Sequence, residues 1–201
     1  MNGVMKMQKP KIVLIGGGGH CKVVINILNS LSTFEIYGIT DNKENIGKKI
    51  LGVTINSTDE DLSDIKMQGV EYAFITLGIT PNSKKRLDLI SRIKSLGFKI
   101  PSIISKYAIV ASSAEIGEGT LIEDGAIVDP CVVIGDHCII NKACVISHDV
   151  IIENNVNLSP GCLINGNSLI KENAYVGTGG IILQGLEIGE NTTVGAGAVV
   201  T

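Results

Sequence analysis

The second half of the chain carries an aliphatic residue at every sixth position, without a slip from residue 110 to residue 200. An α-helix repeats every 3.6 residues and an ordinary strand every 2, so neither produces a period of six. A hexapeptide repeat does, and it predicts a parallel β-helix whose stacked coils share one core. The aliphatic positions are Val110, Ile116, Ile122, Val128, Ile134, Ile140, Ile146, Ile152, Leu158, Ile164, Ile170, Val176, Ile182, Ile188, Val194 and Val200.

A second position in each hexad, four residues after the aliphatic one, is mostly small. Cys138, Cys144 and Cys162 occupy it, and a buried cysteine behaves as a small hydrophobe. We therefore expect these three side chains to face the core. The larger residues at this position are Val132, Val150, Val156 and Leu186.

The first hundred residues follow a different pattern, in which short aliphatic runs alternate with segments of helical spacing. Helices are predicted for Cys21 to Leu31 and for a segment that Pro81 opens and Gly97 ends. This alternation predicts a small parallel α/β domain, Rossmann-like, over residues 1–102, followed by the β-helix over 103–201. The predicted strands are Lys11 to Gly16, Phe34 to Thr40, Glu71 to Gly78 and a short one within Phe98 to Ile104.

Composition and charge exclude several functional classes. Hydrophobic residues make up 44% of the chain and charged residues 18%, which indicates a globular protein. A net charge of -3 provides no electrostatic surface for nucleic acid or an acidic membrane. No apolar run reaches the length of a membrane span or a signal peptide, so we expect a cytoplasmic protein. The five cysteines form no CxxC motif, and no metal site is predicted.

The segment "GGGGHCKV" follows a predicted strand and precedes a predicted helix. In that context a glycine-rich loop can place a phosphate at a helix N-terminus. As a dinucleotide fingerprint it is poor, because Cys21 stands where the third glycine or an alanine belongs. The sequence therefore argues against NAD. The alternative to a phosphate site is a tight strand-to-helix turn that needs glycine only for its backbone.

One of the three histidines lies in "ISHDVI", within the aliphatic repeat. The six-residue register makes Ile146 a core residue and points His148 away from the core. A neutral imidazole can accept a proton as a nucleophile attacks a carbonyl carbon, so His148 is a candidate general base. Asp149 could fix the tautomer of the imidazole, but only if the chain bends between the two residues, since neighbours on a strand point apart. The alternative is a solvated histidine on a coil corner.

The repeat resembles the rule of left-handed β-helix acyltransferases, in strings such as "IGEGTLIEDGAIV" and "VGAGAVV". The N-terminal "IVLIGGGGHCKVV" with "ITDN" narrows the resemblance to bacterial sugar acetyltransferases that join a Rossmann-like domain to such a helix. That family includes NeuD-type sialic acid O-acetyltransferases and N-acetyltransferases of UDP-linked 4-amino sugars, and the resemblance covers residues 10–201. It implies a homotrimer, acetyl-CoA in the groove between subunits, and a nucleotide sugar or sialic-acid-like sugar against the N-terminal domain.

The resemblance also implies roles for residues of the β-helix. His148 matches the family's catalytic base, and Asn141 matches an asparagine near the base and substrate, although a turn asparagine is an equal alternative. Gly166, one coil of three hexads beyond His148, would place a backbone N–H at the thioester carbonyl. Asn157 stands where many members carry a second histidine and could donate a hydrogen bond to the acetyl oxygen, but it cannot titrate. Residues lining the CoA groove would be Thr178 and Ala196.

In the N-terminal domain the resemblance implies a nucleotide-sugar pocket. The residues expected to form it are Gly16, Gly18, Gly19, His20, Asp41, Asn42 and Gly78. The sequence leaves open whether the acceptor is the nitrogen of a nucleotide-linked amino sugar or an oxygen of a sialic-acid-like sugar. Two other classes remain: a trimeric sugar-binding scaffold without chemistry, and a β-helix of the carbonic-anhydrase type. The latter needs metal histidines that His20, His137 and His148 do not provide.

Overall fold

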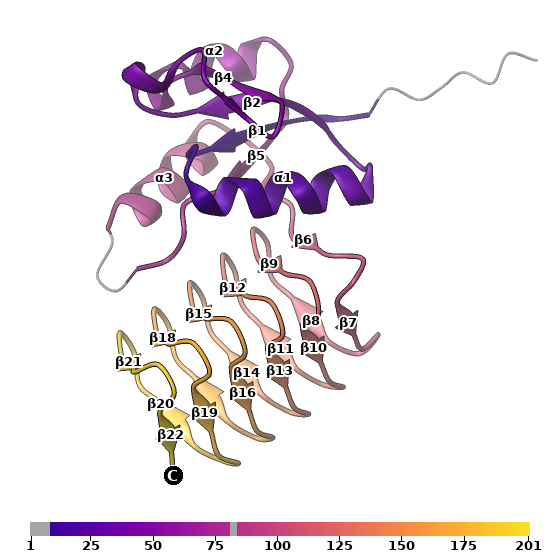
Figure 1. Ribbon diagram of the computed structural model, residues 1–201, viewed down its shortest axis with the longest axis vertical. Coiled ribbons are helices and arrows are strands. Elements are labelled where there is room, and N and C mark those ends of the chain that lie inside the picture. Colours follow the sequence, from indigo (N-terminus) through magenta and orange to yellow (C-terminus); the bar gives the residue numbers. More distant parts are fainter. Residues whose placement is uncertain (1–8, 81–83) are drawn as a thin grey trace, which may run out of the picture.

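The computed structural model describes residues 9–80 and 84–201, which form an α/β part packed on one flank of a β-helix (Figure 1). The α/β part has a five-stranded sheet of order β3-β4-β2-β1-β5, parallel except for the β3–β4 pair. Its strands are β1 (Lys11–Ile15), β2 (Glu35–Thr40), β3 (Lys49–Ile50), β4 (Val53–Ser57) and β5 (Tyr72–Ile75). Its helices are α1 (Gly19–Leu31), α2 (Leu62–Met67) and α3 (Lys84–Ser95), with short 3-10 turns at Lys43–Asn45 and Asp59–Asp61.

Strand β1 shows why this part folds in three layers. Successive side chains of a strand point to opposite faces of its sheet. Ile12 and Leu14 pack with α1, whereas Val13 and Ile15 pack with α2 and α3. All four side chains are fully buried, as expected for a parallel sheet that helices cover on both faces.

Two expectations for this part need correction, and one lies outside the described residues. Residues 98–104 do not form one strand of the α/β sheet: Lys99 makes an isolated bridge to Tyr72, and Ile103–Ile104 already belong to the β-helix. Pro101 separates the two pieces, because proline lacks the N–H that a continuous strand would use. Strands β3 and β4 and helix α2 were not predicted from the sequence. Pro81 is not among the described residues.

The β-helix is built from two-residue strands on three faces (Figure 1). We name them the domain face, the aliphatic face and the third face. The domain face consists of β6 (Ile103–Ile104), β9 (Leu121–Ile122), β12 (Ile139–Ile140), β15 (Asn157–Leu158), β18 (Tyr175–Val176) and β21 (Thr193–Val194). The aliphatic face consists of β7 (Ile109–Val110), β10 (Ile127–Val128), β13 (Val145–Ile146), β16 (Leu163–Ile164), β19 (Ile181–Ile182) and β22 (Val199–Val200). The third face consists of β8 (Glu115–Ile116), β11 (Val133–Ile134), β14 (Ile151–Ile152), β17 (Leu169–Ile170) and β20 (Glu187–Ile188).

The six-residue register predicted from the sequence is confirmed by the packing. Every strand pairs in parallel with the strand three hexads further along, for example Val145 with Leu163, so one coil spans three hexads. The second residue of each strand faces inward, and Cys138, Cys144 and Cys162 are fully buried beside them. The fold is therefore a left-handed parallel β-helix with one aliphatic core.

The coil corners share a backbone conformation that the sequence pattern did not reveal. Every sixth residue from Gly119 to Gly197 has a positive φ, and asparagine, aspartate or glycine occupies most of these positions. These residue types tolerate the left-handed region best. Asp149, with a φ of 58°, is one of them, so the chain turns sharply just after His148.

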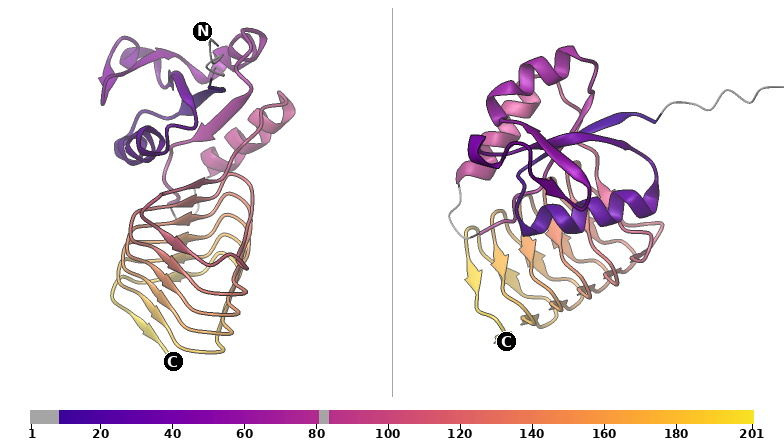
Figure 2. Two further views of the ribbon diagram at one scale, coloured as in Figure 1. Left: turned by 90° about the vertical axis from the view of Figure 1, so that its right-hand side faces the viewer. Right: turned by 45° about the horizontal axis from the view of Figure 1, so that its top comes forward.

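The α/β part lies against the domain face, as the labels beneath α1 in Figure 1 and the side view in Figure 2 show. Leu121 and Ile139, the outward residues of two coils, belong to the same buried cluster as Val24 and Leu28 of α1. This apolar contact holds α1 against the coils. None of the helices in residues 9–80 and 84–201 is long and apolar enough to span a membrane.

Candidate active site

His148 lies at the corner between the aliphatic face and the third face, which we call the base corner. The turn at Asp149 brings its carboxylate back toward the imidazole, and the Nδ1–Oδ2 distance is 2.8 Å. Both side chains are more than half exposed, at 57% and 53%. A carboxylate at Nδ1 favours the tautomer that leaves Nε2 free to accept a proton. The pair therefore has the geometry of an oriented base on an open surface.

Gly166 occupies the same corner one coil beyond His148. A Cβ at position 166 would lie 2.9 Å from His148 Nε2 and 2.8 Å from Cε1. Only glycine therefore allows the imidazole to keep its present position. Asn167 N–H donates to the His148 carbonyl at 3.2 Å, whereas the Gly166 N–H makes none of the backbone hydrogen bonds that hold the described coils together. A free backbone N–H next to a base can stabilise a developing oxyanion.

A second site lies between the α/β part and the β-helix, as a cavity of about 220 Å³. It brings together five residues that the resemblance implied: His20, Gly78, Asn141, Asn157 and Thr178. The other lining residues are Ile79, Ile139, Ser159, Pro160 and Tyr175. The β-helix contributes the domain face and its corner with the aliphatic face, which we call the cavity corner.

The polar groups of this cavity are held by hydrogen bonds. Asn141 Nδ2 donates to the Leu158 carbonyl at 2.7 Å, and Asn157 Nδ2 donates to Ser159 Oγ at 2.9 Å. Asn157 and Ser159 are nearly fully buried. The amide oxygens of both asparagines therefore remain oriented, with Asn157 Oδ1 3.5 Å from Asn141 Nδ2.

His20 forms the opposite wall of the cavity, at the first turn of α1. Burial, with the positive charges of Arg86 and Lys142 nearby, lowers the pKa of His20 to about 4. Its Nδ1 lies 3.7 Å from Glu123 Oε1, and its Nε2 has no hydrogen-bond partner within residues 9–80 and 84–201. At neutral pH His20 is therefore an uncharged imidazole.

The glycine-rich loop before His20 divides into two parts. Gly16 has a φ of 103°, and a Cβ there would lie 2.5 Å from Leu77 Cδ2, so the fold itself requires this glycine. Gly17 N–H donates to Asp41 Oδ2 at 2.6 Å. Around Gly18 and Gly19 a Cβ would meet nothing within 4 Å. These last two glycines lie at the start of α1 with open space beside them, where a phosphate group could approach the helix N-terminus.

Asp41 and Asn42 line a separate cavity of about 540 Å³ at the ends of β2 and β4. The Asp41 carboxylate accepts hydrogen bonds from Gly17 N–H, Asn42 N–H and Asn45 Nδ2. Partial burial alone would raise its pKa, but the hydrogen bonds from Asn45, Asn42 and Gly17 outweigh that effect and lower it. Asp41 thus holds the glycine loop, while Asn42 is the more open of the two toward a ligand.

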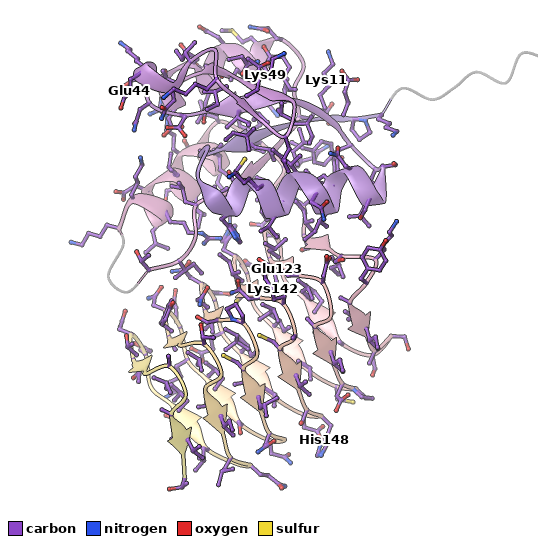
Figure 3. The ribbon with its side chains drawn as sticks, in the orientation of Figure 1. Lys11, Glu44, Lys49, Glu123, Lys142 and His148 are labelled. Atoms are coloured by element: carbon purple, nitrogen blue, oxygen red, sulfur yellow. The ribbon has the colours of Figure 1, made fainter. Side chains whose placement is uncertain are left out.

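The structure separates the implied site residues of one chain into two groups. His148, Asp149 and Gly166 lie at the base corner, whereas Asn141 and the cavity lie across the aliphatic face at the cavity corner. Figure 3 shows His148 away from Glu123 and Lys142, which lie beneath α1. The implied CoA residues Thr178 and Ala196 are exposed and one coil apart, also at the cavity corner.

Sequence reasoning missed Ser159, which lines the cavity, and Glu123 and Arg86, which lie close to His20. Ser159 and Glu123 each lie one coil from Asn141, so the coil length that related His148 to Gly166 could have found them. Arg86 could not have been found this way. It is 3% exposed and donates to Asn155 Oδ1 at 2.8 Å and to the Leu77 carbonyl at 3.3 Å, a contact between two distant parts of the chain. No group of three or more His, Cys, Asp or Glu side chains able to hold a metal ion occurs in the described part of the chain.

Two family models match the two parts of the chain. The family model of the PglD N-terminal domain matches residues 11–93, and that of the bacterial transferase hexapeptide, six repeats, matches residues 131–166. No curated protein sequence matches the chain closely. The hexapeptide match and the similar structures solved with CoA and acetyl-CoA show that the chain is an acyltransferase with acetyl-CoA as cosubstrate.

Solved structures identify the family. The chain is 32% identical to perosamine N-acetyltransferase (PerB) from Caulobacter crescentus, solved with CoA and GDP-perosamine, with a TM-score of 0.88 over 95% of this chain and 88% of that one. It is 31% identical to the acetyltransferase domain of PglB from Neisseria gonorrhoeae, solved with acetyl coenzyme A, with a TM-score of 0.87 over 96% and 91%. WeeI from Acinetobacter baumannii is 27% identical, with a TM-score of 0.83 over 96% and 92%. The chain belongs to this family of sugar acetyltransferases with an N-terminal PglD domain and hexapeptide repeats.

Proposed function

We propose that this enzyme transfers the acetyl group of acetyl-CoA to the amino group of a nucleotide-linked amino sugar, with His148 as general base. The observation that carries the proposal is the base corner, where an imidazole oriented by a carboxylate faces a glycine backbone. The similarity to an enzyme solved with GDP-perosamine supports a nucleotide sugar as acceptor. The free Nε2 of His148 and the nearby Gly166 N–H have complementary tasks in such a transfer.

In the proposed step one C–N bond forms, one C–S bond breaks and one proton moves from the amine to CoA. The neutral amine of the sugar attacks the thioester carbonyl carbon, a C–N bond forms, and the Gly166 N–H stabilises the oxyanion. His148 Nε2 accepts the proton that the nitrogen loses, while Asp149 stabilises the imidazolium from Nδ1. The C–S bond then breaks, and CoA leaves as a thiolate that takes up the proton as a thiol. General base catalysis of this kind contributes about 10²- to 10⁴-fold to the rate.

We propose further that a complete site needs two copies of the chain in a homotrimer. The outward residues of the aliphatic face are all aliphatic, and Ile109, Leu163 and Val199 are 66%, 38% and 55% exposed. A row of exposed aliphatic side chains of this kind marks a surface that binds another protein surface. The face separates the base corner from the cavity corner. Threefold packing around it would bring the base corner of one subunit toward the cavity corner of the next.

In this arrangement the N-terminal part, residues 1–102, holds the nucleotide sugar, and the β-helix, residues 103–201, holds acetyl-CoA. Gly18 and Gly19 at the start of α1 offer N–H groups to the diphosphate, and His20 and Asn141 face the sugar in the cavity. Thr178 and Ala196 lie along the exposed cavity corner, where the extended CoA molecule would follow the coils.

The proposal is tested by measuring thiol release from acetyl-CoA with a panel of acceptors: GDP- and UDP-linked amino sugars, CMP-sialic acid and free sialic acids. We expect release with at least one nucleotide-linked amino sugar, and a product that gains one acetyl group on nitrogen by mass spectrometry. Release with the sialic acids alone would instead establish O-acetylation. No release with any acceptor, while CoA still binds, would favour a scaffold without chemistry.

A further inference from the structure

Glu123 is a buried carboxylate that the proposed reaction does not yet use. It is 2% exposed and lies at the cavity corner, directly after β9. Asn141 and Ser159 occupy the same place one and two coils further on, and both line the cavity. Polar side chains therefore occupy this position in three successive coils, and the first of them is the Glu123 carboxylate next to His20.

The surroundings of His20 are charged on several sides. Glu123 Oε1 lies 3.7 Å from Nδ1, and Lys142 Nζ lies 3.7 Å from Glu123 Oε2. Arg86 of α3 and Lys142 add positive charge that disfavours protonation of the ring. Burial raises the pKa of Glu123, while Lys142 opposes that rise. A histidine between two cations and one carboxylate stays neutral, and its tautomer is then set by which nitrogen faces the carboxylate.

We propose that Glu123 is a positioning residue that holds His20 in the Nδ1–H tautomer, so that Nε2 accepts a hydrogen bond from the sugar in the cavity. The inference rests on the proposed function. A neutral imidazole has one donor and one acceptor nitrogen, and a carboxylate facing Nδ1 selects N–H there. The separation of 3.7 Å is longer than a hydrogen bond, so Glu123 acts on the free enzyme through its charge. Contacts of this kind can shorten when substrate binds.

This assignment gives the cavity a defined preference. Nε2 of His20 lacks a partner within residues 9–80 and 84–201, and the cavity is the space beside it. A sugar that presents an N–H or O–H to Nε2 satisfies the buried acceptor. A sugar with a deoxy carbon at that position leaves it unsatisfied, which weakens binding and discriminates between otherwise similar acceptors.

The tautomer of His20 can be measured by NMR, without an activity assay. The chain has only three histidines, and long-range ¹H–¹⁵N correlation spectra of the imidazoles report which nitrogen carries the proton. His20→Gln identifies the His20 signals by their loss. We expect the Nδ1–H form in the unmodified protein and a shift toward Nε2–H in Glu123→Gln. An Nε2–H tautomer of His20 in the unmodified protein overturns the proposal, whether or not any variant folds.

Kinetics with the best acceptor provide the second measurement. We expect Glu123→Gln to raise KM for the sugar by roughly five- to tenfold with little change in kcat or in KM for acetyl-CoA, as loss of a ground-state contact does. The same substitution in a His20→Gln background should add nothing, because Glu123 acts through His20. An equal penalty in both backgrounds overturns the inference.

Asp124→Asn is the matched control. Asp124 is the neighbouring acid at the same corner, and its carboxylate contacts Ser105 Oγ rather than His20. It should change neither the tautomer nor KM for the sugar. If thiol release fails with every acceptor, the proposed function fails while the tautomer measurement still decides the role of Glu123. If release is seen and the tautomer is wrong, only the Glu123 inference fails.

Discussion

The base corner and the cavity corner share the same backbone repeat but differ in how far their side chains are exposed. At the base corner His148 is 57% exposed, and its partners are its sequence neighbour and the coil above. Where Asn141 and Ser159 lie, the N-terminal part covers the cavity corner, and the side chain of His20 is 16% exposed. The covered corner can select and orient a ligand within one chain. The open corner carries the proposed base but lacks walls, and in the proposed trimer a neighbouring subunit would supply them. If the proposed trimer forms, each chain contributes half of two separate sites.

The largest expected effect is loss of the base itself. His148→Ala should lower the rate of acetyl transfer by about 10² to 10⁴-fold, because the amine proton loses its acceptor. Thiol release at saturating acetyl-CoA measures the rate, and CoA binding by calorimetry should be retained. His148→Asn, which can donate and accept but cannot titrate near neutral pH, is the control for shape. An unchanged rate in His148→Ala would remove this residue from the mechanism.

Gly166→Ala tests whether the base depends on the coil above it. A Cβ there would lie within 3 Å of two imidazole atoms, so the ring has to move. Displacing a reacting group by about 1 Å can cost roughly 10²-fold, so we expect turnover to slow by roughly ten- to a hundredfold. Thermal melting should change little, because the two nearest atoms belong to the end of the exposed His148 side chain, which can swing aside. Gly189→Ala, whose Cβ would meet only Thr192 Oγ1 at 3.4 Å, should leave turnover unaltered.

Mixing two inactive variants tests whether the site is shared between subunits or complete within one chain. We expect His148→Ala and Asn141→Leu each to be nearly inactive as pure trimers, but to recover about a quarter of the wild-type activity when mixed equally during refolding, as random pairing across shared interfaces requires. His148→Ala mixed with Gly166→Val should recover nothing, because both changes affect the same corner. Absence of recovery in the first mixture, with mixed trimers verified by mass spectrometry, argues for a site within one chain.

The smallest expected effect concerns His137, at the corner between the third face and the domain face. Burial, then Lys94 and Arg86, lowers its pKa to about 4, whereas Asp136 and Glu118 oppose the shift. Because its pKa in the unfolded chain is near 6.5, the unfolded state binds more protons, and stability falls as pH drops from 6.5 toward 4. This cost is about 2 kcal/mol at pH 5.

His137→Asn should remove this contribution to acid sensitivity, while that of His20 remains. Asparagine suits the φ of 58° at this corner, where Asn155 and Asn173 already hydrogen-bond one coil apart at 2.8 Å. Urea unfolding at pH 7 and pH 5 provides the measurement. The variant should lose less stability on acidification than the unmodified protein. An equal loss in both would mean that His137 is not the group that titrates.

The repeat made the β-helix predictable, because one inward position every six residues leaves no alternative register. Burial of Cys144 and Cys162 followed from the same rule. The turn that brings Asp149 back to His148 could not be predicted in this way. The residue with positive φ at a corner is glycine or asparagine in many coils and even a histidine at His137, so its identity does not mark the turn. The separation of His148 from Asn141 could not be predicted either, because it depends on which of the three faces each corner adjoins. Strand β3 has only two residues, and β4 (Val53–Ser57) is polar at three of its five positions, so neither shows the aliphatic run that identified the other strands.

The left-handed corners also limit how such an enzyme can change in length. Each coil uses three hexads and advances roughly 4.8 Å, the spacing of paired strands. An insertion of one or two hexads would move every later strand to another face, and any other insertion would turn inward residues outward or form an external loop at a corner. Evolution can therefore lengthen the track from the base corner to the far end of CoA only by duplicating whole coils. Among relatives of this chain, insertions within the prism should come as complete coils, and all others should lie at corners.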